Sequence, residues 1–324
     1  MIKYKVCIIG CGDIGFLFDH KKNTEGALSH FKAFRDSEHF EIKGIAESKK
    51  DIRQIIETEY ETDVYEDYNL MCSEKFPEVI VIAANDEAHF DILKKAAVYK
   101  PLLVFCEKPL TLDHEETKEI IKLYSDLNIR LQVNFTRRFL DEFYDIKNLI
   151  NKKAIGDIES ATFYYSRGLI HNASHYLDLV NWYFENAETE LNVVSVKEGL
   201  HKHDDTVSFN LIYDNGMEIR FIGLKPSKLS FAEVDFVGTA GRIKINYKNE
   251  IEKYKVTENK TFSGYSSYEL YETKAIQYQK ALPNAVENIY GSLSRDEKLK
   301  SPAEQSLKIF ELINRIREKG KCQN

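Results

Sequence analysis

The sequence lacks the features that mark several large classes of protein. Its longest apolar runs, at residues 79–84 and 102–106, are far too short to cross a membrane, so we expect no membrane contact. It has no basic run longer than pairs such as Lys21-Lys22, and its net charge of -7 argues against a surface for nucleic acid. This charge does not exclude an anionic substrate in a local pocket.

Cysteine is scarce and shows no paired pattern. No C-x-x-C occurs, and the spacing suggests neither disulfides nor a metal site. Several of the cysteines lie in or beside predicted strands, so we expect buried free thiols in a reducing cytoplasm. The chain also enters its first predicted strand without a signal peptide, and it has no internal repeats. The five residues are Cys7, Cys11, Cys72, Cys106 and Cys322.

The stretch that organises the rest lies at the start of the chain. Residues 6–9 form an apolar, β-branched run, as expected for a strand buried on both faces. The motif Gly10-Cys11-Gly12-Asp13-Ile14-Gly15 follows and opens a predicted helix. In such a turn Gly10 permits the tight bend, Gly12 lets the backbone approach a pyrophosphate, and Gly15 lets the helix pack closely. Three glycines can also mark an ordinary turn, but the strand–turn–helix context favours dinucleotide binding.

The second predicted strand, residues 40–46, ends at Glu47. An acidic residue at this place normally accepts hydrogen bonds from the adenosine ribose and repels a 2′-phosphate, which predicts NAD. The distance from the glycine turn exceeds the usual ~20 residues, and an insertion at residues 19–30 explains the difference. Glu47 can alternatively be a helix-capping acid, and Lys49 and Lys50 keep NADP possible.

The pattern of elements divides the chain in two. A length of 324 residues suits two domains, because single cores tend to split beyond ~250 residues. Strand and helix signals alternate over residues 3–127, which predicts a doubly wound parallel sheet. Strands dominate later, with hairpin turns at Asn215-Gly216 and at residues 238–241. The predicted class is therefore α/β, with an N-terminal Rossmann domain and a C-terminal α/β domain built on a large, open, mostly antiparallel sheet.

The predicted boundary falls at residue 128. Residues 1–128 make the dinucleotide-binding domain, and residues 129–324 make the second domain, beginning with a strand at 129–135. A last helix starts near Ser301-Pro302 and stops at Gly320. Packing of this helix back onto the first domain is left open.

Glu107-Lys108-Pro109 follows a buried parallel strand, at the edge where open α/β sheets place their ligands. A lysine there can hydrogen-bond a substrate hydroxyl and favour its alkoxide as hydride leaves. Pro109 restricts Lys108 to extended conformations and so fixes the direction of its side chain. The alternative is a solvated strand end without a chemical role.

A second polar cluster occupies residues 168–178. Ser174 is interpreted as the N-cap of an amphipathic helix, which places His175 in its first turn and Asp178 on the same face. A histidine with a pKa near neutrality can take a hydroxyl proton during oxidation and return it during reduction. A histidine satisfied by backbone groups at a domain seam is the competing interpretation.

In this order the motifs resemble those of the Gfo/Idh/MocA family of NAD(P)-dependent oxidoreductases, and the likeness covers nearly the whole chain. The glycine turn and the Glu-Lys-Pro segment match two family motifs at the expected separation. Further likenesses are Asn85 and His89 as the family's Asn-x-x-x-His, Arg137-Arg138-Phe139, Gly156-Asp157-Ile158, and His175 with Asp178 as its His-x-x-Asp.

The resemblance implies hydride transfer between nicotinamide and a secondary alcohol of a sugar, aminosugar or nucleotide sugar, with no metal. Lys108 and His175 would act at the reacting carbon. The open sheet would mediate a homodimer or homotetramer. The implied substrate contacts are Arg138, His171, Asn172 and Asp178. The implied cofactor contacts are Gly10, Gly12, Asp13, Ile14, Gly15, Glu47, Asn85, His89 and Glu107.

One departure from the family pattern leaves the proton relay open. Many members carry an aspartate four residues before the histidine, where this chain has His171 followed by Asn172. A non-catalytic dinucleotide-binding sensor is therefore the alternative function, and a net non-redox reaction with a tightly held cofactor is a third. Arg137, Arg167 and Lys225 are either ligands for an anionic substrate group or surface residues.

Overall fold

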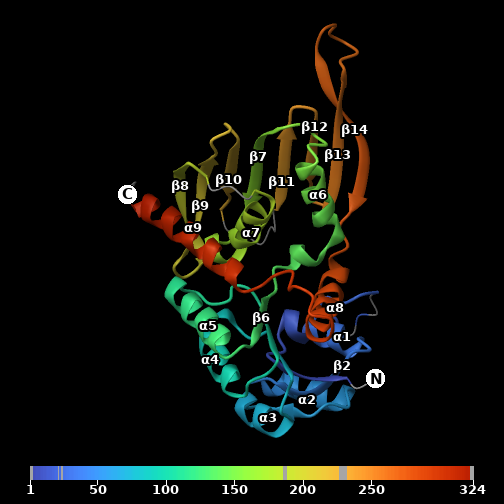
Figure 1. Ribbon diagram of the computed structural model, residues 1–324, viewed down its shortest axis with the longest axis vertical. Coiled ribbons are helices and arrows are strands. Elements are labelled where there is room, and N and C mark those ends of the chain that lie inside the picture. Colours follow the sequence, from blue (N-terminus) through green and yellow to red (C-terminus); the bar gives the residue numbers. More distant parts are fainter. Residues whose placement is uncertain (1–2, 21, 23–24, 185–187, 226–231, 322–324) are drawn as a thin grey trace. The chain divides into compact units, whose positions relative to one another are not determined.

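The computed structural model describes residues 3–20, 22, 25–184, 188–225 and 232–321 (Figure 1). The chain forms two compact units. The first comprises Met1–Leu140 and Gln277–Leu307, and the second comprises Asp141–Ile276 and Lys308–Asn324. The first unit thus runs beyond the predicted boundary at 128 and takes in a segment from near the end of the chain. Cys322 and the insertion residues 21, 23 and 24 lie outside the described residues.

The first unit is built on a parallel sheet, which confirms the predicted doubly wound fold. Among the described residues its strand order is β3-β2-β1-β4-β5-β6, so the order reverses direction between β1 and β4. Strands β4 and β5 are buried on both faces, in agreement with their continuous apolar sequences. The strands are β1 Tyr4–Ile9, β2 Phe40–Ala46, β3 Val64–Tyr65, β4 Val79–Ile82, β5 Leu103–Cys106 and β6 Arg130–Val133.

Helices cover this sheet, with α4 and α5 together on one side of β6 and α1 and α8 together on the other (Figure 1). Strand β3 and helix α3 were not predicted, and the strand that becomes β6 was predicted as part of the second domain. The helices are α1 His30–Arg35, α2 Lys50–Glu59, α3 Tyr68–Lys75, α4 His89–Val98, α5 His114–Asp126 and α8 Ala281–Ser294. Short helical turns are η1 Asp13–Leu17, η2 Asp86–Ala88, η3 Thr136–Phe139 and η5 Tyr278–Lys280.

The second unit is built on a larger sheet of order β14-β13-β12-β11-β7-β10-β9-β8. Within the described residues β7 and β10 pair in parallel and the other pairs are antiparallel, as predicted. The strands are β7 Ile158–Tyr165, β8 Glu190–His201, β9 Asp204–Ile212, β10 Glu218–Gly223, β11 Glu233–Gly238, β12 Gly241–Ile245, β13 Glu250–Glu258 and β14 Ser266–Ala275.

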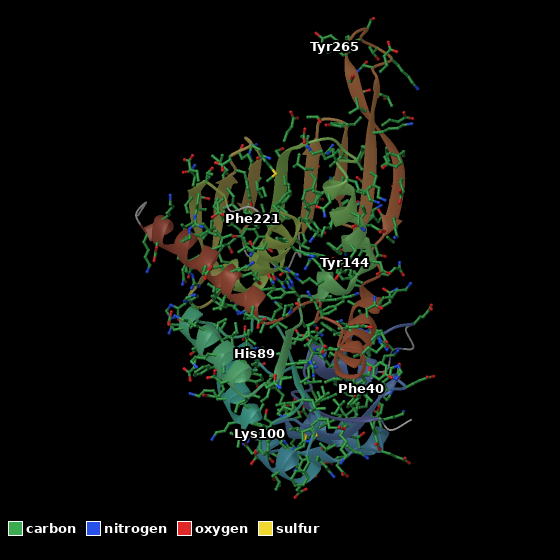
Figure 2. The ribbon with its side chains drawn as sticks, in the orientation of Figure 1. Phe40, His89, Lys100, Tyr144, Phe221 and Tyr265 are labelled. Carbon is green, nitrogen blue, oxygen red and sulfur yellow. The ribbon has the colours of Figure 1, made fainter. Side chains whose placement is uncertain are left out.

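Figure 1 shows α6 and α7 over one face of this sheet. Beneath them the rings of Phe163 and Phe209 each stack on Phe221, at 4.9 and 4.5 Å between centroids. The hairpin of β13 and β14 extends past the other strands, with Tyr265 at its tip (Figure 2). The helical elements of this unit are α6 Asp141–Asn151, η4 Leu169–Ala173, α7 Ser174–Tyr183 and the part of α9 Glu304–Lys321 from residue 308 on.

No helix in the described part of the chain is both long and apolar enough to cross a membrane. The cysteines that the structure describes are free and buried, as the sequence predicted. Burial raises the pKa of each of these thiols, so they remain protonated at neutral pH.

Candidate active site

The glycine turn is closely packed at two of its glycines and open at the third. Gly10 has φ +91°, and a Cβ there would lie 2.6 Å from the carbonyl oxygen of Ala83. A Cβ on Gly15 would lie 2.3 Å from the carbonyl oxygen of Gly10, so both positions require glycine for packing. Gly12 differs, because a Cβ there would meet nothing within 4 Å. The turn is therefore tight on its inner side and open at Gly12, where a phosphate would approach.

The predicted helix after this turn forms as η1, a single π-helical turn. The amide of Leu17 donates to the carbonyl of Gly12 at 3.0 Å, which closes the wider ring of a π-turn. The exposed Asp13 stands in its first turn. This segment ends at the insertion, whose far side is anchored because the Asp19 carboxylate accepts from the amides of Leu28 and Ser29.

A groove of about 490 Å³ adjoins the turn at the carboxyl ends of β1, β2 and β4. This is the edge where the strand order reverses, the usual ligand position in an open α/β sheet. Among its lining residues, Gly10, Gly12, Glu47 and Asn85 were predicted as cofactor contacts. Tyr68 also lines it, but it belongs to the β3–α3 segment, whose two-residue strand gave too weak a pattern to detect.

Glu47 connects the glycine turn to the end of β2. The side chain is buried, with 7% exposed, and its Oε2 accepts from the amide of Cys11 at 2.7 Å. Its Oε1 accepts from the amide of Lys49 at 2.8 Å. The N-cap residue of α2 is Lys49, so the alternative of a helix-capping acid does not describe Glu47. The carboxyl group instead forms part of the wall of the groove.

Glu107, at the end of β5, is the centre of a buried polar cluster. Its Oε1 lies 2.7 Å from Nε2 of His30 and accepts from Nδ2 of Asn134 at 2.6 Å. The amide of Lys108 donates to Oε2 at 3.3 Å. Burial raises the pKa of Glu107, but the hydrogen bond and charge of His30, with Asn134 and Lys108, lower it by more. The net pKa lies below that of an ordinary carboxyl, so the group is ionised beside Lys108.

His89 links the segments that follow β4 and β5. Its Nδ1 lies 2.8 Å from the carbonyl oxygen of Pro109, and its Nε2 lies 3.1 Å from that of Ala84. The residue is 1% exposed and begins α4; it is labelled in Figure 2. Both ring nitrogens therefore face backbone carbonyls, and the contact of His89 with the cofactor stays a prediction.

The Arg137-Arg138-Phe139 element forms η3, and Arg138 is buried. Its Nη1 lies 3.5 Å from the carbonyl oxygen of Lys300, and the side chain of Asn284 donates to the carbonyl of Phe139 at 2.8 Å. These contacts join η3 to the late segment of the first unit. The substrate contact of Arg138 stays a prediction.

In the second unit, the structure corrects the predicted start of the histidine helix. Helical structure begins earlier, as η4 after Gly168, and continues directly into α7. Ser174 is therefore inside a helical stretch and is not an N-cap; its buried hydroxyl has no hydrogen-bond partner among the described residues. The carboxylate of Asp204 provides the cap instead, accepting from the amides of Ile170 at 2.8 Å and His171 at 3.1 Å.

Asp204 also holds the side chain of His171. Its Oδ2 lies 2.5 Å from Nδ1 of His171, and the His171 ring stacks on His201 at 3.8 Å between centroids. The pairing of His171 with Asp204 was not predicted, because the two residues are 33 positions apart in the sequence. No local pattern distinguishes Asp204 from the exposed Asp205 beside it.

The remaining predicted residues of this cluster are on the same helical stretch. His175 is half-buried near the start of α7, Asp178 is buried one turn later, and Asn172 is half-buried in η4. The joint action of Lys108 and His175 on one carbon stays a prediction. Across the described residues, no group of three or more histidine, cysteine, aspartate or glutamate side chains is arranged to hold a metal ion.

Comparison with known proteins identifies the class. Residues 4–135 match the family described as "Oxidoreductase family, NAD-binding Rossmann fold", abbreviated GFO_IDH_MocA. Residues 4–135 therefore match the NAD-binding Rossmann domain of the Gfo/Idh/MocA family, in agreement with the family resemblance and the NAD cofactor predicted from the sequence.

Among curated relatives, the chain is 30% identical over 209 residues to the inositol 2-dehydrogenase/D-chiro-inositol 3-dehydrogenase of Lactiplantibacillus plantarum. The match covers 61% of this chain and 57% of that protein. It is 30% identical to the inositol 2-dehydrogenase of Salmonella typhimurium over 153 residues, 47% of this chain and 43% of the relative. The chain thus spans about half the length of these relatives.

Solved structures show the same fold across the whole chain. An oxidoreductase from Agrobacterium radiobacter in complex with NAD+, L-tartaric acid and magnesium superposes with a TM-score of 0.76 at 15% identity, covering 100% of this chain and 98% of that one. The UDP-N-acetylglucosamine 3-dehydrogenase GnnA from Acidithiobacillus ferrooxidans gives 0.74 at 13% identity and covers 98% of each chain. At these identities the likeness concerns the fold alone.

Proposed function

We propose that the protein is an NAD-dependent dehydrogenase acting on a secondary alcohol of a sugar-like polyol. The observation that carries this proposal is the glycine turn, open at Gly12, beside a groove whose wall holds the ionisable Glu47. The matched family supports the cofactor, and the relatives named inositol dehydrogenases favour a cyclic polyol such as myo-inositol over other sugar-like alcohols. Sugars, aminosugars and nucleotide sugars remain within the proposed class.

The proposed cofactor contacts follow from the first unit. The backbone at Gly12 would approach the pyrophosphate, and Glu47 would accept from the adenosine ribose hydroxyls while repelling a 2′-phosphate. Asn85, which also lines the groove, would contribute a further contact. Bound NAD+ supplies a nicotinamide ring that accepts a hydride.

Lys108 and His175 are proposed to act on the alcohol. Lys108 follows the carboxylate Glu107 at the ligand edge of the sheet, and its ammonium would hydrogen-bond the hydroxyl oxygen and stabilise the developing alkoxide. His175 would take the hydroxyl proton during oxidation and return it during reduction. We further propose a cytoplasmic homodimer or homotetramer that binds a small-molecule substrate and neither nucleic acid nor membrane.

The test combines turnover with separate measurement of cofactor binding. Purified protein is mixed with NAD+ and a panel of polyols and sugars that includes myo-inositol, and the absorbance of reduced nicotinamide is followed. We expect Lys108→Ala and His175→Ala each to lower kcat by ~10²-fold or more, while NADH affinity stays at the wild-type value. The exposed Lys118 and His203 provide matched controls as Lys118→Ala and His203→Ala.

Three results would contradict the proposal in different ways. Wild-type turnover by both variants would exclude the roles of Lys108 and His175. Tight NADH binding with no turnover across the panel would favour a dinucleotide sensor. Conversion of substrate without net NADH would indicate a cofactor that is reduced and reoxidised within each turnover.

A further inference from the structure

Asp204 packs closely against the backbone of two glycines, Gly168 and Gly199. The residue begins β9 and is 2% exposed. A Cβ on Gly168, where φ is +94°, would lie 2.0 Å from Oδ2 of Asp204, and a Cβ on Gly199 would lie 1.8 Å from its carbonyl oxygen. A side chain at either glycine would therefore clash with Asp204. With two amides donating to it as well, the carboxylate is held in a single orientation.

This orientation determines which nitrogen of His171 carries a proton. Oδ2 of Asp204 is 2.5 Å from Nδ1 of His171, so Nδ1 is the donor and the neutral ring has its lone pair on Nε2. Stacking on His201, with 12° between the ring planes, fixes the plane of the imidazole. The His171 side chain keeps 18% of its surface exposed, whereas Asp204 keeps 2%. In this pair the Asp204 carboxylate is buried, whereas the His171 ring is partly exposed.

His171 and His175 are four residues apart in one continuous helical stretch, η4 followed by α7. Residues at this spacing are neighbours on a helix, with about 5–6 Å between Cβ atoms. Two imidazoles at such a separation can exchange a proton directly or through one water.

We propose that His171 and Asp204 form the inner half of a proton relay that acts through His175. This inference rests on the proposed dehydrogenase function. During oxidation the hydroxyl O–H bond breaks and its proton moves to His175, while the carbon loses a hydride to nicotinamide and becomes a carbonyl carbon. The proton then moves from His175 to Nε2 of His171. The resulting imidazolium is balanced by the Asp204 carboxylate and releases its proton to water.

In this relay Asp204 provides a carboxylate next to His171, the residue that stands where many family members carry an aspartate. His171 and Asp204 are positioning residues, because they act on the alcohol only through His175. A purely structural Asp204, serving as a cap for the amides of Ile170 and His171, would make different predictions. It would affect stability without affecting the protonation state of His171 or kcat.

The first arm of the test measures the tautomer of His171 by NMR on protein with ¹⁵N-labelled histidine, the resonance being assigned with His171→Gln. We expect the Nδ1–H form in the wild type. In Asp204→Asn a single carboxamide oxygen remains for the amides of Ile170 and His171 and for Nδ1, so the preference of the ring for the Nδ1–H form should fall and the Nε2–H form should become more populated. Asp205→Asn removes an exposed neighbouring charge and should leave the tautomer unchanged.

The second arm measures kcat, the KM for myo-inositol and the affinity for NADH. We expect Asp204→Asn and His171→Gln each to lower kcat by ~10²-fold, with KM and NADH affinity within about twofold of wild type. The double variant should be no slower than either single variant, since the two residues act as one unit. His171→Gln leaves the capping carboxylate in place, so this variant decides the result if Asp204→Asn does not fold.

Each outcome has a definite meaning. Wild-type kcat in His171→Gln, or an Nε2–H tautomer in the wild type, overturns the relay. If the wild-type protein turns over no substrate, the proposed function fails and the relay fails with it. The tautomer of Asp204→Asn then shows separately whether the His171–Asp204 pair exists as a structural unit.

Discussion

Each of the two units pairs a carboxylate with a histidine, and the two pairs differ in how far the histidine is buried. In the first unit His30 lies 2.7 Å from Glu107 and its side chain is 0% exposed. In the second unit His171 lies 2.5 Å from Asp204 and keeps 18% of its side chain exposed. Similar distances therefore coexist with very different access to water.

This difference suits the His30–Glu107 pair to a structural role and the His171–Asp204 pair to the proposed transfer of protons. Oε1 of Glu107 is near both His30 and Asn134, and Nδ1 of His30 has no hydrogen-bond partner in the described residues. A ring without access to water cannot exchange protons during turnover, so this pair fixes the segment before Lys108. His171 retains an exposed edge, which a group that releases protons to water requires.

The largest expected effect comes from removing each histidine in turn. His30→Ala leaves the buried Glu107 carboxylate without the imidazole that faces it and opens a cavity, so we expect the free energy of unfolding to fall by about 3–5 kcal/mol. His171→Ala leaves Asp204 with two amide donors at a site that water can reach, and we expect a loss of about 1 kcal/mol. Urea denaturation measures both values.

The single tryptophan, Trp182 in α7, allows unfolding of the second unit to be followed separately. Its fluorescence reports on the second unit, while far-ultraviolet circular dichroism reports on both. The fall in the free energy of unfolding caused by His30→Ala should be seen in the denaturation curve followed by dichroism and should be smaller in the curve followed by fluorescence. Equal losses for the two variants would remove the distinction between the pairs.

A smaller effect concerns pH. The folded-state pKa of Glu107 lies below its unfolded value, so the unfolded state binds more protons and stability rises with pH through this interval. The contribution is fully present above the ordinary carboxyl pKa of ~4.3 and is lost as pH falls through the folded-state value. Glu107→Gln should therefore be less stable than wild type at pH 7, and the difference in free energy of unfolding between the two proteins should become smaller below about pH 4. A difference independent of pH would mean that Glu107 is not ionised in the folded protein.

The smallest expected effect concerns Glu47, a buried carboxylate that binds amides and no histidine. Glu47→Gln keeps an acceptor for the amide of Cys11 but removes the negative charge. We expect NADPH affinity to rise relative to NADH by about tenfold, equivalent to ~1.4 kcal/mol. Cofactor titrations with both nucleotides measure the ratio, and Glu66→Gln, at another acidic residue lining the groove, is the control. An unchanged ratio would exclude Glu47 from cofactor discrimination.

Much of the fold could be predicted because its determinants are local. The continuous apolar sequences of β4 and β5 and the hairpin turn at Asn215-Gly216 specify their elements over a few residues. The two-residue β3 has no comparable periodicity, and the sheet that β6 joins depends on its pairing with β5. Pairing partners and unit boundaries are properties of distant contacts.

The candidate site divides in the same way. The glycine turn and Glu107-Lys108-Pro109 were found because their chemistry follows a strand directly in the chain. The N-cap of the helix that contains His175 was assigned to Ser174, whereas in the structure the helical stretch begins earlier, at η4, and Asp204 of β9 accepts from the amides at its start. Local hydrogen-bonding preference could not distinguish these two sources of an acceptor.

The sequence by itself determined the class of this protein, because strand periodicity, glycine spacing and the order of short motifs are written along the chain. Tertiary structure decided which histidines and carboxylates lie within hydrogen-bonding distance of each other. His30 with Glu107 and Asp204 with His171 are pairs separated by 77 and 33 residues, and only folding brings such groups within hydrogen-bonding distance. The electrostatics of a buried site depend on those distances and on burial, neither of which is encoded in any single segment.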